Sequence, residues 1–238
     1  MAFKWTEEKI KYFKDASEYT GFHRQVGEII KPYLDPSWTL CDLGCGLGFL
    51  DLQIADSVSE ITAIDLSDLA IADYKSRLEN ADIHNIDIWL GDADKDIEGS
   101  WDVLLLSFFG KPGEELKRLF PIAAKRVILI TYVEPLSEKH GRLTKTDNRP
   151  TTKDYENFLK GEKYRYKLIE KEMDFGQPFK TLEDAERYHE SYSREKDPEK
   201  RSELIDENLQ NVKSTGDSEF PYYLPKKKDI GIFIVELS

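Results

Sequence analysis

Apolar residues along the chain follow two periods, and the two periods alternate. Short apolar runs, which favour buried strands, occur at 38–42, 61–65, 86–90, 101–109, 126–133, 166–175 and 229–237. Apolar positions three or four residues apart, which favour helices, occur between these runs at 47–54, 68–78, 114–123 and 151–164. Such alternation predicts a doubly wound α/β fold, in which a mostly parallel sheet carries helices on both faces.

Two segments lie outside this alternation. The first 35 residues have a helical pattern, with Phe22 and Val26 on its apolar face, and Pro36 ends it. Residues 177–228, before the last run, are strongly charged and helical. An insertion of this length is either a substrate lid or a pair of helices that pack on the sheet domain, and both interpretations stay open. We expect three parts: a helical cap at 1–35, an α/β domain at 36–176 and 229–238, and a helical insertion at 177–228.

The turn after the first run is rich in glycine, with the sequence Asp-Leu-Gly-Cys-Gly-Leu-Gly-Phe at 42–49. Glycine lets the backbone come close to a ligand. Phe49 stands where a dinucleotide-binding loop has its third glycine, and Asp42 would repel a pyrophosphate. An acid at this place suits a ligand with positive charge, such as the sulfonium and ammonium groups of S-adenosylmethionine.

A second acid ends the next run. Asp65 follows the second run, at about the 20-residue spacing that puts an acid at the tip of the neighbouring strand, where it can accept both hydroxyls of a ribose. Asp65 could instead cap the following helix, but Ser67 is already suited to that position. Because parallel strands end at one edge of a sheet, Asp42, Asp65 and Asp92, which follows the third run, predict a single crevice.

With these features the chain resembles the class I S-adenosylmethionine-dependent methyltransferases, whose first motif is acid-x-Gly-x-Gly-x-Gly. The resemblance covers nearly the whole chain and implies a Rossmann-like, seven-stranded sheet with an antiparallel last strand. It implies S-adenosyl-L-methionine as cofactor and S-adenosyl-L-homocysteine as its product. The cofactor-binding residues that it implies are Asp42, Gly44, Cys45, Gly46 and Gly48 near the methionine end, Asp65 and Leu66 near the ribose, Asp92 and Ala93 near the adenine, and Ser107.

Composition narrows the classes of function. The 238 residues include 34 Lys and Arg against 46 Asp and Glu, and the formal net charge of −12 argues against phosphate-driven nucleic-acid binding. Two cysteines, Cys41 and Cys45, lack the second pair that a zinc site needs, so no metal is expected. No apolar run is long enough to span a membrane, and the N-terminus lacks a signal-peptide core, so we expect a cytoplasmic protein.

The sequence indicates the methyl acceptor less clearly than it indicates the cofactor. Methyl transfer depends mostly on positioning, and a histidine can remove a proton from the acceptor. The fourth run ends in Ser-Phe-Phe-Gly at 107–110, not in the Asn/Asp-Pro-Pro-aromatic turn of methyltransferases that act on nucleobase or glutamine amino groups. We therefore expect a small-molecule acceptor. The candidate catalytic residues are His23, His140 and His189.

Three alternative functions remain open. A protein or RNA methyltransferase would carry the same cofactor motif. A non-catalytic regulatory module would bind the cofactor without turnover. A nicotinamide-dependent oxidoreductase would use Asp65 on the adenosine ribose, but Phe49 and Asp42 disfavour it.

Overall fold

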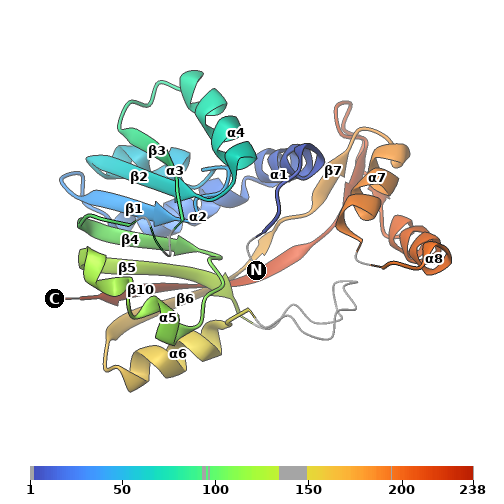
Figure 1. Cartoon of the computed structure of the whole chain (residues 1–238). Helices are drawn as coiled ribbons and strands as arrows, with labels where there is room; N and C mark the ends of the chain where they lie inside the picture. Colours follow the sequence, from blue (N-terminus) through green and yellow to red (C-terminus); the bar gives the residue numbers. More distant parts are fainter. Residues whose placement is uncertain (1–2, 93–94, 96, 134–148, 194, 238) are drawn as a thin grey trace. The chain divides into compact units, whose positions relative to one another are not determined.

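The chain divides into two compact units, each built from pieces that are distant in sequence (Figure 1). The computed structural model describes residues 3–92, 95, 97–133, 149–193 and 195–237. The sheet unit consists of His23–Glu172 and Asp229–Ser238. The small unit consists of Met1–Phe22 and Met173–Lys228. The N-terminal helix thus belongs with the insertion, whereas the segment that begins at His23 belongs with the sheet as far as Glu172.

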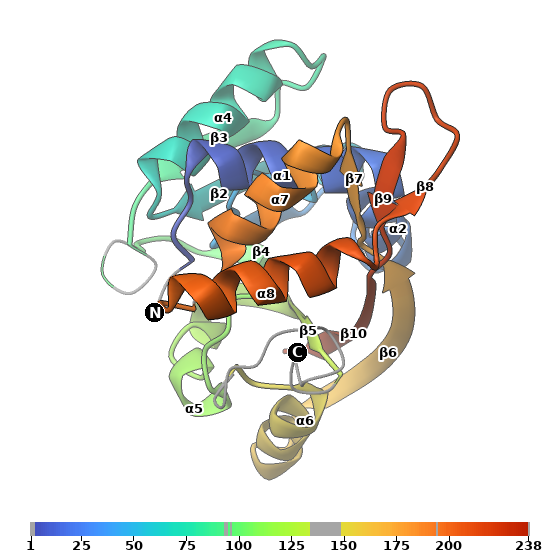
Figure 2. The ribbon, with the colours of Figure 1, turned by 90° about the vertical axis from the view of Figure 1, so that its right-hand side faces the viewer.

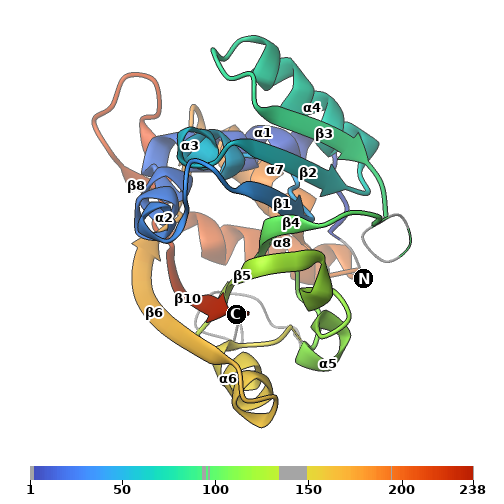
Figure 3. The same cartoon turned by 90° about the vertical axis from the view of Figure 1, so that its left-hand side faces the viewer.

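The sheet unit is built on a seven-stranded sheet in the order β3-β2-β1-β4-β5-β10-β6, with β3 and β6 at its edges (Figure 3). The strands from β1 to β5 pair in parallel, and β10 runs antiparallel to β5. The strands are β1 (Thr39–Leu43), β2 (Glu60–Asp65), β3 (Ile86–Leu90), β4 (Trp101–Ser107), β5 (Ala123–Tyr132), β6 (Arg165–Asp174) and β10 (Lys227–Glu236). The predicted fold class, a mostly parallel, Rossmann-like seven-stranded sheet, is confirmed.

The strand order creates a place for a ligand. β1 pairs with β2 on one side and with β4 on the other, so the chain reverses its direction of travel across the sheet at β1. In open α/β sheets the crevice at the carboxyl ends of the strands beside such a switch point is where ligands bind. Asp42 lies in β1 and Asp65 is the last residue of β2, so both acids lie at this edge.

Helices bury the faces of the sheet. On one face Leu116, Phe158 and Leu159 pack in a core with alternate residues of β1, β4, β5 and β10. The intervening strand residues are buried as well, which explains why the strands appear in the sequence as continuous apolar runs. The helices of this unit are α2 (Phe22–Ile30), η1 (Lys31–Tyr33), α3 (Asp51–Ile54), η2 (Ala55–Ser57), α4 (Asp68–Glu79), α5 (Gly113–Leu116), η3 (Phe120–Ile122) and α6 (Thr152–Gly161).

The small unit has its own core. Tyr12, Phe179 and Ala185 are buried together and are surrounded by partly buried aromatic and aliphatic side chains. In Figure 2, α7 and α8 run past each other beside a three-stranded sheet of order β7-β9-β8. The elements are α1 (Glu7–Thr20), β7 (Gln177–Phe179), α7 (Leu182–Tyr192), α8 (Pro198–Leu209), β8 (Lys213–Ser214) and β9 (Tyr222–Leu224).

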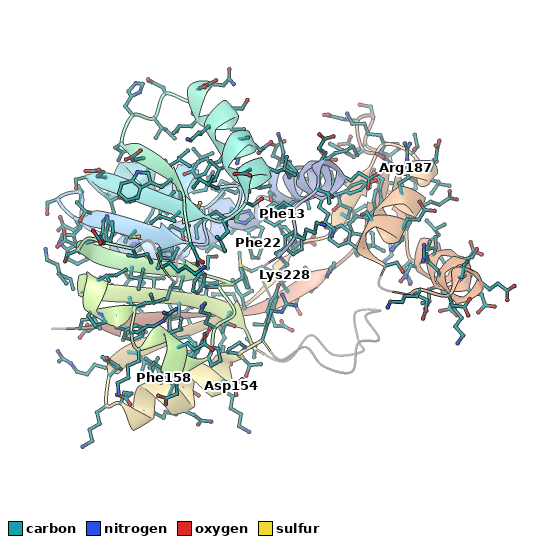
Figure 4. All side chains as sticks on the ribbon, in the orientation of Figure 1. Phe13, Phe22, Asp154, Phe158, Arg187 and Lys228 are labelled. Atoms are coloured by element: carbon teal, nitrogen blue, oxygen red, sulfur yellow. The ribbon has the colours of Figure 1, made fainter. Side chains whose placement is uncertain are left out.

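A second cluster in the small unit joins its N-terminal and C-terminal pieces. The Nζ atom of Lys228 lies 3.4 Å from the ring centroid of Phe175 and 4.9 Å from that of Phe22. The ring centroids of Phe13 and Phe175 lie 5.5 Å apart, and Figure 4 shows Phe13, Phe22 and Lys228 directed towards one region. These contacts join α1 and the start of α2 to Phe175, which follows β6, and to Lys228 of β10.

Four elements differ from the prediction. The helix expected at 114–123 is divided into α5 and η3. The helix after the glycine turn begins at Asp51, not at residue 47, and is a single turn, because the three glycines before it adopt left-handed φ angles that prolong the loop. The N-terminal helix is divided at Gly21, whose φ of 62° ends α1. The insertion contains a small sheet besides its helices, because strands of two or three residues are too short to show a period.

Candidate functional site

The glycine loop after β1 is held in a shape that other residues would not adopt. Gly44 has a φ of 76°, and a Cβ atom there would lie 2.8 Å from the ring of Phe109. Gly48 has a φ of 66°, and a Cβ atom there would overlap the ring of Tyr74. Both backbone conformation and packing therefore require glycine. The loop is thus fixed between the end of β4 and helix α4.

Four backbone N–H groups of this loop already donate hydrogen bonds within the protein. Those of Gly44 and Cys45 donate to the carbonyl of Ile64 at 2.8 and 3.1 Å. That of Gly46 donates to Oδ2 of Asp65 at 2.9 Å, and that of Gly48 donates to the carbonyl of Cys45 at 2.9 Å. A pyrophosphate needs such groups to point outward. The loop is therefore unsuited to a dinucleotide.

Asp65 is oriented by its neighbours at the end of β2. Its Oδ2 accepts from the N–H of Gly46 and its Oδ1 accepts from the N–H of Ser67, each at 2.9 Å. The Ser67 hydroxyl oxygen accepts from the N–H of Ala70 at 3.3 Å, so Ser67 is the cap of α4, as predicted. Each carboxylate oxygen still has a lone pair for a second donor, which is what two ribose hydroxyls would require.

The other predicted cofactor residues lie at neighbouring strand ends. Leu66 follows Asp65 and is 55% exposed. Asp92 follows β3 by two residues and forms an ion pair with Lys95 at 3.0 Å. Ser107 is the last residue of β4 and is partly buried. Ala93 lies outside the described residues.

Beneath the loop lies an acid pair, Asp42 and Asp51, that the sequence indicated only in part. Asp42 is 2% exposed and Asp51, the first residue of α3, is 0% exposed. Within the described ranges the Oδ1 atom of each accepts no hydrogen bond, whereas the Tyr74 hydroxyl donates to Oδ2 of Asp51 at 3.0 Å. Burial, and then the charges of Asp51 and Asp65, hold the pKa of Asp42 well above its ordinary value. Burial also raises the pKa of Asp51.

The three candidate histidines have different surroundings. The ring of His23, on α2, stacks on that of Phe49 with a centroid distance of 5.4 Å and an interplanar angle of 28°. The guanidinium carbon of Arg77 lies 4.1 Å from the centroid of the same Phe49 ring. His23 is thus beside the glycine loop. His189 lies on α7 of the small unit, where burial lowers its pKa to about 4 and keeps it neutral at pH 7. His140 lies outside the described residues.

An aromatic group with a cation lies at the ends of β4 and β5. Phe108 has a φ of 52°, an uncommon conformation for a bulky residue and one that stores strain. Its ring centroid lies 4.8 Å from that of Tyr132, and the guanidinium carbon of Arg149 lies 5.2 Å from the Tyr132 centroid. Sequence reasoning named Phe108 but missed Tyr132 and Arg149. Tyr132 comes beside Phe108 through the pairing of β4 with β5, and Arg149 precedes Thr151, which forms a bridge with Tyr132.

The helices in the described part of the chain are all too short or too polar to cross a membrane. Among the same residues, three or more His, Cys, Asp or Glu side chains do not gather where they could hold a metal ion.

Comparison with known proteins identifies the family. A family model described as a methyltransferase domain matches residues 34–192, more than half of the chain. The ribosomal protein L11 methyltransferase of Campylobacter lari is 32% identical over 81 residues. That match covers 33% of this chain and 28% of the relative, so the chain spans little more than a quarter of the length of this curated relative.

Solved structures agree on the fold. Magnesium protoporphyrin IX methyltransferase from Synechocystis PCC 6803, crystallised with S-adenosylhomocysteine, superposes with a TM-score of 0.55 at 14% identity, covering 99% of this chain and 90% of that one. The YcgJ protein from Bacillus subtilis superposes with a TM-score of 0.55 at 13% identity, covering 89% and 98%. With the family match and the strand order, these comparisons place the chain among the class I methyltransferases, whose methyl donor is S-adenosylmethionine. The chain belongs to the methyltransferase domain family of class I S-adenosylmethionine-dependent methyltransferases.

Proposed function

We propose that the protein transfers the methyl group of S-adenosylmethionine to a small, planar, anionic acceptor at the carboxyl edge of its sheet. The acid pair beneath the glycine loop is the observation that carries this proposal. Two buried acid groups, beside a loop whose N–H groups are used internally, suit a cationic ligand and not a phosphate. S-adenosylmethionine carries a sulfonium and an ammonium group and fits this arrangement.

Each acid along this edge would contact a different part of the cofactor. Asp42 lies closest in sequence to the glycine loop and would face the methionine end. Asp65, whose two oxygens are already oriented by backbone N–H groups, would accept the ribose hydroxyls. Asp92 would accept from the adenine amino group. The cofactor supplies an activated methyl group, and these side chains bind and orient it.

The group of Phe108, Tyr132 and Arg149 supports a planar and acidic acceptor. Aromatic faces offer an apolar surface on which a planar molecule can stack and which excludes water from the methyl group. A guanidinium recognises a carboxylate through two parallel hydrogen bonds. The Nζ atom of Lys111 lies 5.8 Å from the ring centroid of Phe109, but it is paired with Glu115 at 3.5 Å. In a chain of net charge −12, the guanidinium of Arg149 beside Tyr132 favours an anionic acceptor.

His23 is the best-placed candidate for a general base. Its contact with Phe49 puts it beside the glycine loop, in the same unit as the acids. An imidazole there could take a proton from an acceptor hydroxyl near neutral pH. A role for His189, and for the small unit as a substrate lid, stays a prediction.

The main experiment is a methylation assay with labelled S-adenosylmethionine and three acceptor classes: small aromatic carboxylic acids, ribosomal protein L11 and total RNA. We expect label in the small acids. Arg149→Gln should raise the KM for the acid more than it lowers kcat, because it removes binding and not chemistry. The exposed Lys153→Gln serves as a control of equal charge change and should alter neither constant. Label in RNA, or an unchanged KM in Arg149→Gln, would contradict the proposed acceptor.

A second candidate is a protein methyltransferase. The stretch shared with the ribosomal protein L11 methyltransferase of Campylobacter lari favours it. Label in protein L11 but not in small acids would support this candidate. Cofactor binding without transfer to any acceptor would support a regulatory module. A melting temperature raised by NADH but not by S-adenosylhomocysteine would contradict the cofactor itself.

A further inference from the structure

Asp42 and Asp51 are two buried acid groups that cannot readily ionise together. They come from different elements, β1 and α3, both are almost fully buried, and the Oδ1 atom of each has no hydrogen-bond partner among the described residues. Each acts on the pKa of the other, as neighbouring acid groups do. Two ionised carboxylates cannot donate to each other, and like charges in a buried site cannot readily ionise together. A single proton shared between the two residues removes one negative charge and gives one oxygen of each residue a hydrogen-bond partner.

The surroundings of the acid pair offer no compensating cation in the described part of the chain. The groups that act on the pair are the carboxylate of Asp65 and the hydroxyl of Tyr74, and burial, together with the charges of the pair, raises the pKa of the Cys41 and Cys45 thiols. The nearby Arg77 donates instead to the carbonyl of Leu47 and to Asp73, and its guanidinium carbon lies 5.7 Å from the centroid of the Tyr74 ring. His23 of α2 lies against Phe49. As far as the described residues go, the positive charge that balances the pair comes from a proton or from a ligand.

We propose that Asp51 is a specificity-determining residue of the cofactor site, through which the acid pair releases its shared proton when the cationic S-adenosylmethionine binds and keeps it when the neutral S-adenosylhomocysteine binds. This inference rests on the proposed cofactor site. The two ligands differ by one methyl group and its positive charge, whereas their ammonium and carboxylate groups are the same. A difference in proton release between them therefore reports on the response of the protein to the sulfonium charge.

The proposal has a consequence for discrimination between donor and product. If binding releases a proton, affinity rises with pH, by up to about tenfold per pH unit for a full proton. The affinity for S-adenosylmethionine should rise with pH more steeply than that for S-adenosylhomocysteine. The preference for donor over product would therefore increase with pH.

The experiment is calorimetric titration of the full chain with each ligand, without acceptor, in phosphate and in Tris at the same pH. The difference in observed heat between buffers counts the protons released. We expect the wild type to release more protons with S-adenosylmethionine than with S-adenosylhomocysteine near neutral pH. In Asp51→Asn the amide can donate to an ionised Asp42, so the difference between the ligands should vanish while both still bind.

A second variant tests the network without altering the acids. Tyr74→Phe removes the donor to Oδ2 of Asp51, so the shared proton should be held more tightly and released at higher pH. Tyr155→Phe is the matched control, because Tyr155 is a buried tyrosine whose hydroxyl donates to the carbonyl of Lys111. It should leave the proton count unchanged.

Two results separate this inference from the proposed function. If both ligands bind the wild type with equal proton release, or if Asp51→Asn keeps the difference, Asp51 does not determine specificity although the cofactor site stands. If neither ligand binds, both proposals fall.

Discussion

Asp65 shows how one side chain can serve the loop and a ligand together. Its oxygens accept from the glycine loop and from the start of α4, and each keeps a lone pair for a proposed ribose hydroxyl. We predict that Asp65→Ala weakens S-adenosylhomocysteine binding by roughly 1.5 to 3 kcal/mol, the loss expected for hydrogen bonds to a charged acceptor. Calorimetric titration measures it, with Asp68→Ala on the exposed start of α4 as control. An unchanged affinity would remove Asp65 from the cofactor site.

Gly48 tests whether the loop is held by packing. The φ of Gly48 is left-handed, and a methyl group there would meet the Tyr74 ring. We predict that Gly48→Ala lowers the free energy of unfolding by about 1 to 3 kcal/mol, as overpacking does. Gly161→Ala, where a Cβ atom would meet nothing within 4 Å, should change it by less than about 0.5 kcal/mol. Denaturant titration compares the two variants. Equal effects on the free energy of unfolding would mean that the loop can rearrange to accommodate a methyl group at residue 48.

The sequence could predict those site residues whose position follows from the neighbouring residues along the chain. Asp42, Asp65 and Asp92 could be named because each follows an apolar run, and parallel strands bring such positions to one edge. Asp51 and Arg149 could not, since their roles depend on burial and on contacts across the fold. An acid between the apolar residues 50 and 52 was the one local sign of Asp51.

At the scale of elements, the start of α6 is set by a reciprocal cap. Oδ2 of Asp154 accepts from the N–H of Thr151 at 2.8 Å and from its hydroxyl at 2.7 Å, and Figure 4 shows Asp154 on this helix. Both hydrogen bonds lower the pKa of Asp154 from 3.8, and the one from the backbone N–H has the larger effect. A carboxylate whose pKa falls on folding adds stability above its unfolded pKa, and this stability is lost as the pH falls through the folded pKa.

We therefore predict that Asp154→Asn lowers the free energy of unfolding at pH 7 by about 0.5 to 1 kcal/mol, the effect of a lost cap. The difference from wild type should shrink as the pH falls below 3.8, where Asp154 of the wild type becomes protonated. Denaturant titrations from pH 7 to pH 3 measure it. Lys153→Gln, which removes a neighbouring charge without the cap, should not reproduce this pH dependence. A constant difference at every pH would rule out the carboxylate as the cause.

The elements themselves were predictable to the extent that burial imposes a period. The central strands are apolar on both faces, and α4 begins at a recognisable serine cap. The helix start after the glycine loop was misplaced because apolar spacing at Leu47 and Leu50 continues through a loop that is buried without being helical. The small sheet was missed because its pairing joins Gln177–Phe179 to residues after α8, a contact without a local signal.

At the scale of the whole molecule, the chain passes between the two units three times, after Phe22, after Glu172 and after Lys228. The units have separate cores, with Phe179 in one and Phe158 in the other. Units with separate cores can lose stability separately. A substrate lid requires such independence, because it must move without disturbing the bound cofactor.

Phe179→Ala provides the last prediction. Phe179 is 0% exposed, and its ring centroid lies 6.4 Å from that of Tyr12 and 5.5 Å from that of Tyr188. Truncation should destabilise the small unit by about 3 to 5 kcal/mol. Amide hydrogen exchange should then quicken in α1 and α7 but not in β1 and β4, and S-adenosylhomocysteine affinity should be unchanged.

Phe158→Ala, in the core under α5 and α6, is the reciprocal control and should quicken exchange in the sheet unit first. If the small unit is a lid, Phe179→Ala should also raise the KM for the acceptor, because the loosened unit would close over it less often. Equal loss of protection in both units from either variant would mean that the molecule unfolds as one cooperative body. In that case the small unit could not open alone, and the lid interpretation would give way to one of structural support.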